Sequence, residues 1–287
     1  MLGEFLGTAI LILLGDGVVA GVLLKGSKGE NAGWLAITAG WAFAVVAGVF
    51  TALACGSPAH LNPAVTLGFA IISGDFSNVI GFSLAQLAGA LVGAVAVWIH
   101  YGPHWSRTSD PNFKLGTFCT IPAIRHPASN LASEIIGTFV LVLVAAAIFS
   151  TRVAASGPAA GLGPYLVGSL VWGIGLSLGG TTGYAINPAR DLGPRIAHAL
   201  LPIPGKRDSD WSYAPIPIIG PLVGAALAER LRLVRAFALG YPVSSGSAWQ
   251  PCNGDARECV EPSVAGVGID RACAAGDRER SAYREAR

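Results

Sequence analysis

The residues best suited to chemistry are two copies of the tripeptide Asn-Pro-Ala. The copies are Asn62, Pro63, Ala64 and Asn187, Pro188, Ala189. Asn is a strong helix N-cap and Pro is favoured at the first helical position, so each copy predicts the start of a helix. A helix start presents backbone N–H groups and a positive dipole end, and the Asn amide adds a further donor. Such a group of donors suits neutral hydroxylic solutes and repels cations.

The helix that follows each copy is too short to cross a membrane. The first apolar stretch ends at Gly74 and Asp75. About 11 residues at ~1.5 Å each give roughly 17 Å, near half the ~30 Å hydrocarbon thickness. The preceding stretches, ACGSPAH and GGTTGYAI, are non-helical backbone, tolerated at membrane depth only when buried in protein or lining a wet cavity. We therefore expect two half-helices whose N-termini meet near the membrane midplane.

The composition indicates an integral membrane protein. Of 287 residues, 52% are hydrophobic and only 13% are charged, and the mean hydropathy is +0.56. Asp, Glu, Lys and Arg are absent from residues 31–74 and 153–189, each longer than the ~20 residues of one membrane-spanning helix. The net charge of +2 does not indicate a nucleic-acid partner. The five cysteines have no metal-ligand spacing, so no metal site is expected.

Hydropathy and an internal repeat predict the architecture. Spans are expected near residues 5–24, 33–54, 79–99, 135–150, 164–180 and 214–229. Each half opens with a similar segment, GEFLGT around Glu4 and SEIIGTF around Glu134, and contains one Asn-Pro-Ala. Three spans per half place the halves in opposite senses in the membrane. The sequence therefore predicts an all-α membrane protein with six transmembrane helices and two re-entrant half-helices in an inverted repeat.

The repeat also divides the chain into segments. Residues 1–100 form the first repeat, 101–130 a connecting loop and 131–235 the second repeat. The tail 236–287 is rich in Gly, Ala, Ser, Pro and charged residues and is expected to be disordered.

Together these features resemble a known family. The doubled Asn-Pro-Ala, the GEFLGT and SEIIGTF pair and the stretch GYAINPARDLGP resemble the major intrinsic protein family, in particular its aquaglyceroporin branch of bacterial glycerol facilitators. The resemblance covers about residues 4–235. It implies a homotetramer in the cell membrane, with cytoplasmic termini and one pore per subunit. The expected function is a passive channel, without a cofactor, for glycerol, similar small neutral solutes and some water.

Arg190 is the strongest single candidate for the pore. A charge inside an apolar segment is costly unless it is paired or faces water, and such residues usually mark a pathway. The resemblance implies that Arg190 forms a narrow selectivity filter with Trp41, Gly175 and Tyr184. Gly175 stands where water-selective members have histidine, and Tyr184 where glycerol facilitators usually have phenylalanine. Two aromatic faces could contact the C–H edge of a polyol while Arg190 donates to its hydroxyls.

Other residues have supporting roles by the same resemblance. Asp191 distinguishes this branch from most water channels, although a first-turn acid is also favoured by the helix dipole. Glu4 and Glu134 are expected to hold the stretches before the half-helices. His60 is expected to bond nearby backbone groups rather than to gate the pore or bind a metal. Asp16 interrupts the first span, and a position facing a vestibule is the expectation for it.

Two other functions are weighed against the channel for polyols. A water-selective channel is disfavoured by Trp41, Gly175 and Asp191. An ion- or proton-coupled transporter also fits inverted repeats with broken helices, but it would need a titratable group where the half-helices meet at two amides. An enzyme is least favoured because no nucleophile, base and orienting group occur together. Basic residues do not follow the positive-inside rule, so the orientation of the chain rests on the resemblance alone.

Overall fold

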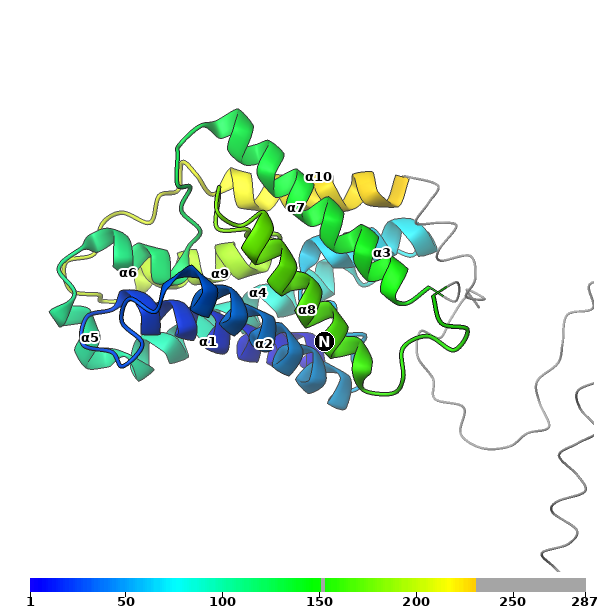
Figure 1. Ribbon diagram of the computed structural model, residues 1–287, viewed down its shortest axis with the longest axis horizontal. Helices are drawn as coiled ribbons and strands as arrows, with labels where there is room; N and C mark the ends of the chain where they lie inside the picture. The colour runs from blue at the N-terminus through cyan, green and yellow to red at the C-terminus, as the bar shows by residue number, and fades with distance from the viewer. Residues whose placement is uncertain (151–152, 231–287) are drawn as a thin grey trace, which may run out of the picture. The chain divides into compact units, whose positions relative to one another are not determined.

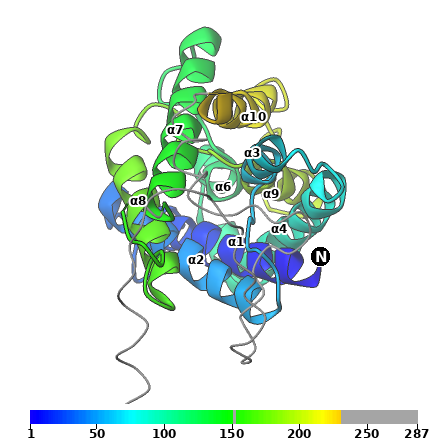
Figure 2. The same ribbon diagram turned by 90° about the vertical axis from the view of Figure 1, so that its right-hand side faces the viewer.

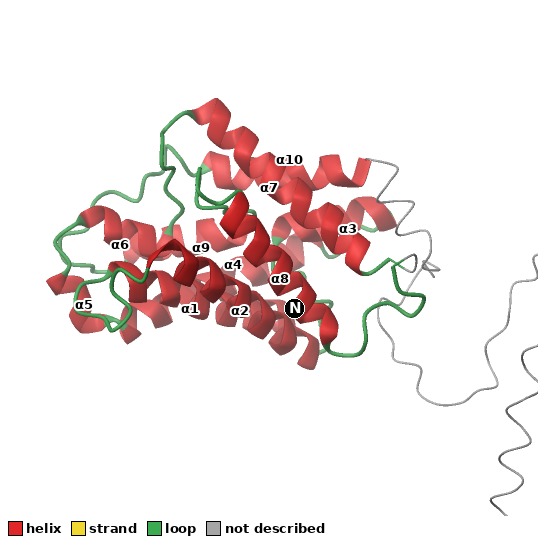
Figure 3. Cartoon of the chain, in the orientation of Figure 1, coloured by secondary structure: helices red, strands yellow, loops and turns green. Residues whose placement is uncertain are grey.

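The structure is a computed structural model that describes residues 1–150 and 153–230, all of which belong to one compact unit. The predicted tail 236–287 lies outside the described residues. Within the described ranges every regular element is a helix, as Figure 3 shows. The expectation of an all-α fold is confirmed for this part of the chain.

Within residues 1–150 and 153–230, four helices are long and apolar enough to cross a membrane. They are α1 (Leu2–Leu23), α2 (Gly33–Ala54), α4 (Val79–His100) and α7 (Pro127–Ile148), each of 22 residues. At ~1.5 Å per residue, this length matches a hydrocarbon core of ~30 Å. The boundary predicted for the fourth span, 135–150, was wrong. Its helix starts at Pro127, and the N-cap His126 accepts a hydrogen bond from the Ser129 amide. The first turns of this helix are polar, so hydropathy does not detect its start.

Two shorter helices correspond to the remaining predicted spans. They are α8 (Leu162–Ser177) and α10 (Pro215–Arg230), each of 16 residues. The predicted connection 101–130 contains two helices that were not expected, α5 (Gly102–Arg107) and α6 (Pro111–Phe118). Asp110 caps α6 by accepting a hydrogen bond from the Asn112 amide at 2.8 Å. The connection is thus ordered, and its helix α6 packs against α1 and α9.

The two Asn-Pro-Ala copies each start a short helix. These are α3 (Pro63–Ser73), of 11 residues, and α9 (Pro188–Leu200), of 13 residues. Asn62 and Asn187 are the N-caps, both with extended backbone, and Pro occupies the first helical position in each. Helix α3 ends at Gly74, whose φ of 73° is the left-handed conformation of a C-cap glycine. The predicted starts of both short helices are confirmed.

The helices pack in two corresponding groups. Helix α1 packs against α2 and α4, and α7 packs against α8 and α10. Each short helix contacts the last helix of the other group, α3 with α10 and α9 with α4. In Figures 1 and 2, α3 and α9 lie between the α1–α2 pair and the α7–α10 pair. Both short helices are therefore held in the interior of the bundle.

Small residues allow this close packing. A Cβ at Gly89 or Gly93 of α4 would collide with a backbone carbonyl of α1, and a Cβ at Gly224 of α10 would collide with one of α7. A Cβ at Gly220 would stand 2.6 Å from the Cβ of Glu134. Without Cβ atoms at these places the backbones can approach closely, as small-xxx-small spacing predicts for helices in lipid.

Candidate functional site

The two Asn-Pro-Ala copies are joined by reciprocal hydrogen bonds. Asn62 Nδ2 donates to the carbonyl of Ile186, and Asn187 Nδ2 donates to the carbonyl of Leu61, both at 2.8 Å. Each Oδ1 meanwhile caps its own helix, accepting from the Ala64 amide at 2.8 Å and from the Ala189 amide at 3.0 Å. Each asparagine thus starts one short helix and ties it to the stretch that leads into the other, so the two N-termini meet.

The stretches before the half-helices have unusual backbone. Ala59, Leu61, Tyr184 and Ile186 all have positive φ, between 38° and 59°. Residues with a Cβ rarely adopt this conformation, and it persists only where surrounding contacts enforce it. The alternation of these residues with residues of ordinary φ gives both stretches the same irregular path.

Two buried glutamates supply contacts that enforce this path. Glu4 accepts hydrogen bonds from the amides of His60 and Leu61 at 2.9 and 2.7 Å. Glu134 accepts from the amides of Ala185 and Ile186 at 3.0 and 2.9 Å. In each half, the carboxylate binds two successive amides just before the asparagine. The equivalent placement of Glu4 and Glu134 in the repeat therefore corresponds to equivalent contacts.

His60 packs beside the first half-helix. Its ring stacks on Phe69 at 4.7 Å between centroids, and its Nδ1 lies 3.2 Å from Thr66 Oγ1. Among residues 1–150 and 153–230, no group of three or more His, Cys, Asp or Glu side chains could hold a metal ion. The contacts of His60 are those of a packing residue.

Arg190 and Trp41, two of the four residues predicted for the filter, lie next to each other. The guanidinium carbon of Arg190 lies 4.1 Å from the centroid of the Trp41 ring, within cation–π range. Arg190 Nη1 also donates to the carbonyl of Phe118 at 3.2 Å. Helices α2 and α9 and the residue at the end of α6 thus converge on one guanidinium.

Gly175 and Tyr184, the other two residues predicted for the filter, also lie next to each other. A Cβ at Gly175 would stand 2.8 Å from Tyr184 Cζ and 2.9 Å from the Tyr184 hydroxyl. Trp34, which sequence reasoning missed, donates from Nε1 to the Gly175 carbonyl at 3.0 Å and meets the Tyr184 ring edge-on at 5.8 Å between centroids. The room that Gly175 leaves is therefore partly occupied by Tyr184.

Asp191 takes part in a buried ion pair. Its carboxylate accepts from Arg195 Nε at 2.7 Å and Nη2 at 3.0 Å, and both side chains are fully buried. It also accepts from the Thr120 amide and hydroxyl at 2.9 and 2.5 Å. Arg195 Nη1 in turn donates to the carbonyl of Ser209 at 2.7 Å. Asp191 thus ties α9 to two connecting segments, and the i,i+4 spacing of Asp191 and Arg195 was the sequence signal for the pair.

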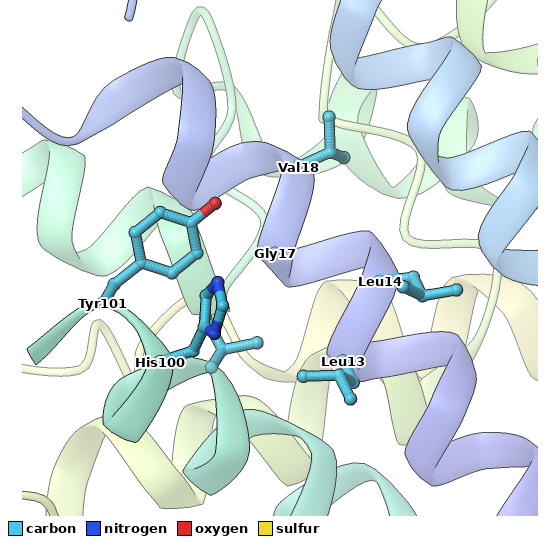
Figure 4. Close-up of a pocket in the computed structure, with 7 residues that line it drawn as sticks. Leu13, Leu14, Gly17, Val18, His100 and Tyr101 are labelled. Atoms are coloured by element: carbon cyan, nitrogen blue, oxygen red, sulfur yellow. The ribbon is translucent and has the colours of Figure 1, made fainter. Parts of the chain in front are cut away.

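The vestibule-facing position expected for Asp16 was wrong. Its side chain is fully buried, and Oδ1 lies 3.7 Å from Arg190 Nη1. A surface pocket on α1 includes Gly17, the residue after Asp16. Figure 4 shows this pocket between α1 and α4, lined by Leu13, Leu14, Gly17, Val18, Val97, His100 and Tyr101. None of these lining residues belongs to the predicted filter or to the Asn-Pro-Ala copies, so this pocket is separate from the candidate site.

Comparison with known proteins assigns the family. Residues 1–231 match the family model described as major intrinsic protein. The chain belongs to the major intrinsic protein family. A probable glycerol uptake facilitator protein of Thermotoga maritima is 57% identical over 232 residues, which cover 80% of this chain and 96% of that protein. Glycerol uptake facilitator protein 3 of Lactiplantibacillus plantarum is 59% identical, over 80% of this chain and 94% of that protein.

A solved structure of the same type is also similar. The X-ray structure of the aquaglyceroporin from Plasmodium falciparum aligns with a TM-score of 0.71 and 30% sequence identity. The alignment covers 83% of this chain and 96% of that one. The chain therefore shares its fold with an aquaglyceroporin, and the four apolar helices fit a membrane channel of the major intrinsic protein family.

Proposed function

We propose that this protein is a passive membrane channel for glycerol and similar small neutral solutes, with some water, and that it excludes protons and other ions. The observation that carries the proposal is the pair of reciprocal bonds between Asn62 and Ile186 and between Asn187 and Leu61. They hold two half-helix N-termini together in the bundle interior. The identity of 57–59% to glycerol uptake facilitators supports glycerol as the solute.

The architecture that we propose has six transmembrane helices and two re-entrant half-helices in an inverted repeat. Two packing relationships support this proposal. Helices α1 and α7 each pack against two helices of their own half, and α3 and α9 each contact a helix of the other half. The first repeat occupies residues 1–100. The second occupies residues 131–235, and α7, the first helix of this half, begins slightly earlier, at Pro127. In this arrangement α3 and α9 together make up a seventh span.

In the proposed mechanism the solute passes Arg190 and then the two asparagines. Trp41 and Tyr184 contact the C–H edge of the polyol, while Arg190 and the two asparagine amides donate hydrogen bonds to its hydroxyls. These bonds replace the water that the solute sheds. The positive ends of the half-helices oppose cations, including hydronium, which is the explanation already given for aquaporins. The chemistry needs neither a cofactor nor a catalytic group.

Assembly and location follow from the family resemblance. We infer a homotetramer in the cell membrane, with one pore in each subunit and cytoplasmic termini. The four apolar helices of 22 residues support the membrane location.

The test is stopped-flow light scattering on proteoliposomes under inward gradients of glycerol, urea or sorbitol, with and without a pH gradient. We expect glycerol to enter much faster than into empty vesicles, sorbitol to be excluded, and the pH gradient to have no effect. Glycerol entry at the rate of empty vesicles, with fast water flow, would establish the water-selective alternative. Acceleration by the pH gradient would establish a coupled transporter.

A further inference from the structure

Asp16 is a buried acid without a hydrogen-bond partner in the described part of the chain. It lies in the middle of α1, its side chain is fully buried, and neither carboxylate oxygen has a partner there. Burying a charge without compensation is costly, so an unbonded carboxylate in this position calls for a nearby opposite charge. Arg190 supplies it, with Nη1 at 3.7 Å from Asp16 Oδ1.

Two successive residues of α1, Gly15 and Asp16, lie against residues of the proposed filter. A Cβ at Gly15 would collide with three ring atoms of Trp41, so the tryptophan ring rests directly on the α1 backbone. The same ring lies against the Arg190 guanidinium at 4.1 Å. Gly15 thus positions the Trp41 ring. Asp16, the next residue, faces the Arg190 guanidinium that lies against this ring.

Three other buried carboxylates are engaged elsewhere. Asp191, next to Arg190 in sequence, is held by Arg195 at 2.7 Å and by Thr120. Glu4 and Glu134 accept from the amides before the half-helices. Asp16 is the carboxylate that forms an ion pair with Arg190 in the structure. An opposite charge at this separation favours the charged form of a buried carboxyl group.

We propose that Asp16 is a specificity-determining residue: as the counter-charge of Arg190 it makes the filter electrically neutral, so that the pore rejects small anions while it admits neutral polyols. This inference rests on the proposed channel function. A filter with Arg190 alone would carry a net positive charge, which attracts anions into the constriction. With Asp16 in place, the filter offers an anion no net electrostatic attraction to offset the free energy that it loses with its hydration.

The test uses Asp16→Asn, which removes the charge with little change in volume. Full-length protein is reconstituted in vesicles, and two rates are measured: glycerol entry, and potassium nitrate entry at pH 7.5 with valinomycin present, so that nitrate limits the rate. Nitrate is a suitable probe because it has no neutral form at this pH. Wild-type vesicles are expected to admit nitrate no faster than empty vesicles.

For Asp16→Asn we expect nitrate entry to rise at least about tenfold and glycerol entry to stay within about threefold of wild type. Asp16→Glu, which keeps the charge, and Asp75→Asn, which removes a carboxylate from the exposed turn before α4, should both still exclude nitrate. Unchanged nitrate entry in Asp16→Asn, with normal glycerol entry, overturns the proposal. If neither Asp16→Asn nor Asp16→Ser inserts, Asp16 serves the fold and the proposal is again overturned. A wild-type protein without glycerol entry overturns the channel function instead.

Discussion

The hydroxyl of Tyr184 lies directly against Gly175. A Cβ at position 175 would stand 2.9 Å from this hydroxyl and 2.8 Å from the ring carbon that bears it. Real Cβ atoms do not lie this close to other atoms, so Tyr184 can occupy its position only because residue 175 is a glycine. The size of the proposed filter is thus set jointly by these two residues.

Gly175→Ala should therefore lower glycerol permeability more than water permeability. The added Cβ forces the Tyr184 ring toward the pore, since Thr38 Cγ2 at 3.0 Å closes the other side. We expect a loss of roughly tenfold for glycerol, which corresponds to ~1.4 kcal/mol of barrier. Light scattering under glycerol and sucrose gradients measures the two rates.

Gly173→Ala is the matched control, because a Cβ at Gly173 of the same helix would meet nothing within 4 Å. It should leave both rates unchanged. Equal loss of glycerol and water in Gly175→Ala would mean that Gly175 is only a packing residue.

Tyr184→Phe should leave the ratio of glycerol to water permeability within about twofold of wild type. The Tyr184 hydroxyl is buried and has no hydrogen-bond partner among residues 1–150 and 153–230, so its removal leaves no group unbonded. The same vesicle assay checks this expectation. A severalfold fall in glycerol entry would show instead that the hydroxyl binds the solute.

Glu4→Gln should destabilise the protein. The carboxylate accepts from two amides, from Ser57 Oγ at 2.5 Å and from Gln86 Nε2 at 2.8 Å. An amide NH₂ in its place would face donors, and each buried group left unbonded costs about 1–3 kcal/mol. We expect a clear fall in the apparent melting temperature in detergent, as measured by fluorescence-detected gel filtration.

Glu30→Gln serves as the comparison for Glu4→Gln. Glu30 bonds Lys25 at 2.6 Å outside the membrane-spanning helices, and this bond holds the pKa of Glu30 below its usual value. Its loss should shift the melting temperature far less. A shift as large as that of Glu4→Gln would contradict the special role of the buried carboxylate.

Asp191→Ala should destabilise the fold without changing selectivity. It leaves the fully buried Arg195 without its carboxylate, and breaking a buried ion pair from one side costs about 3–5 kcal/mol. The yield of folded protein should fall, while the inserted fraction keeps its ratio of glycerol to water entry. Asp208→Asn, at an exposed carboxylate paired with Arg207, should change neither the yield of folded protein nor the ratio of glycerol to water entry. A changed ratio in Asp191→Ala would place Asp191 in the filter itself.

Several features could be predicted because their causes are local. Helix starts at Asn62 and Asn187 follow from cap chemistry within a few residues, and the end of α3 follows from where its apolar run stops, at Gly74. The matching Glu4 and Glu134 follow from the repeat. By contrast, α7 begins at Pro127 in a polar stretch that hydropathy does not register, and α5 and α6 lie in a connection with weak periodicity.

The sequence by itself determined that this is a helical membrane protein with a short helix starting at each Asn-Pro-Ala copy, because composition, apolar run length and capping act over short distances. Only the tertiary structure decided that Asp16 faces Arg190 and that Tyr184 occupies the room beside Gly175. Residues 16 and 190 lie far apart in the chain, and no local pattern encodes which side chains two packed helices bring together. That choice depends on the packing of the whole bundle.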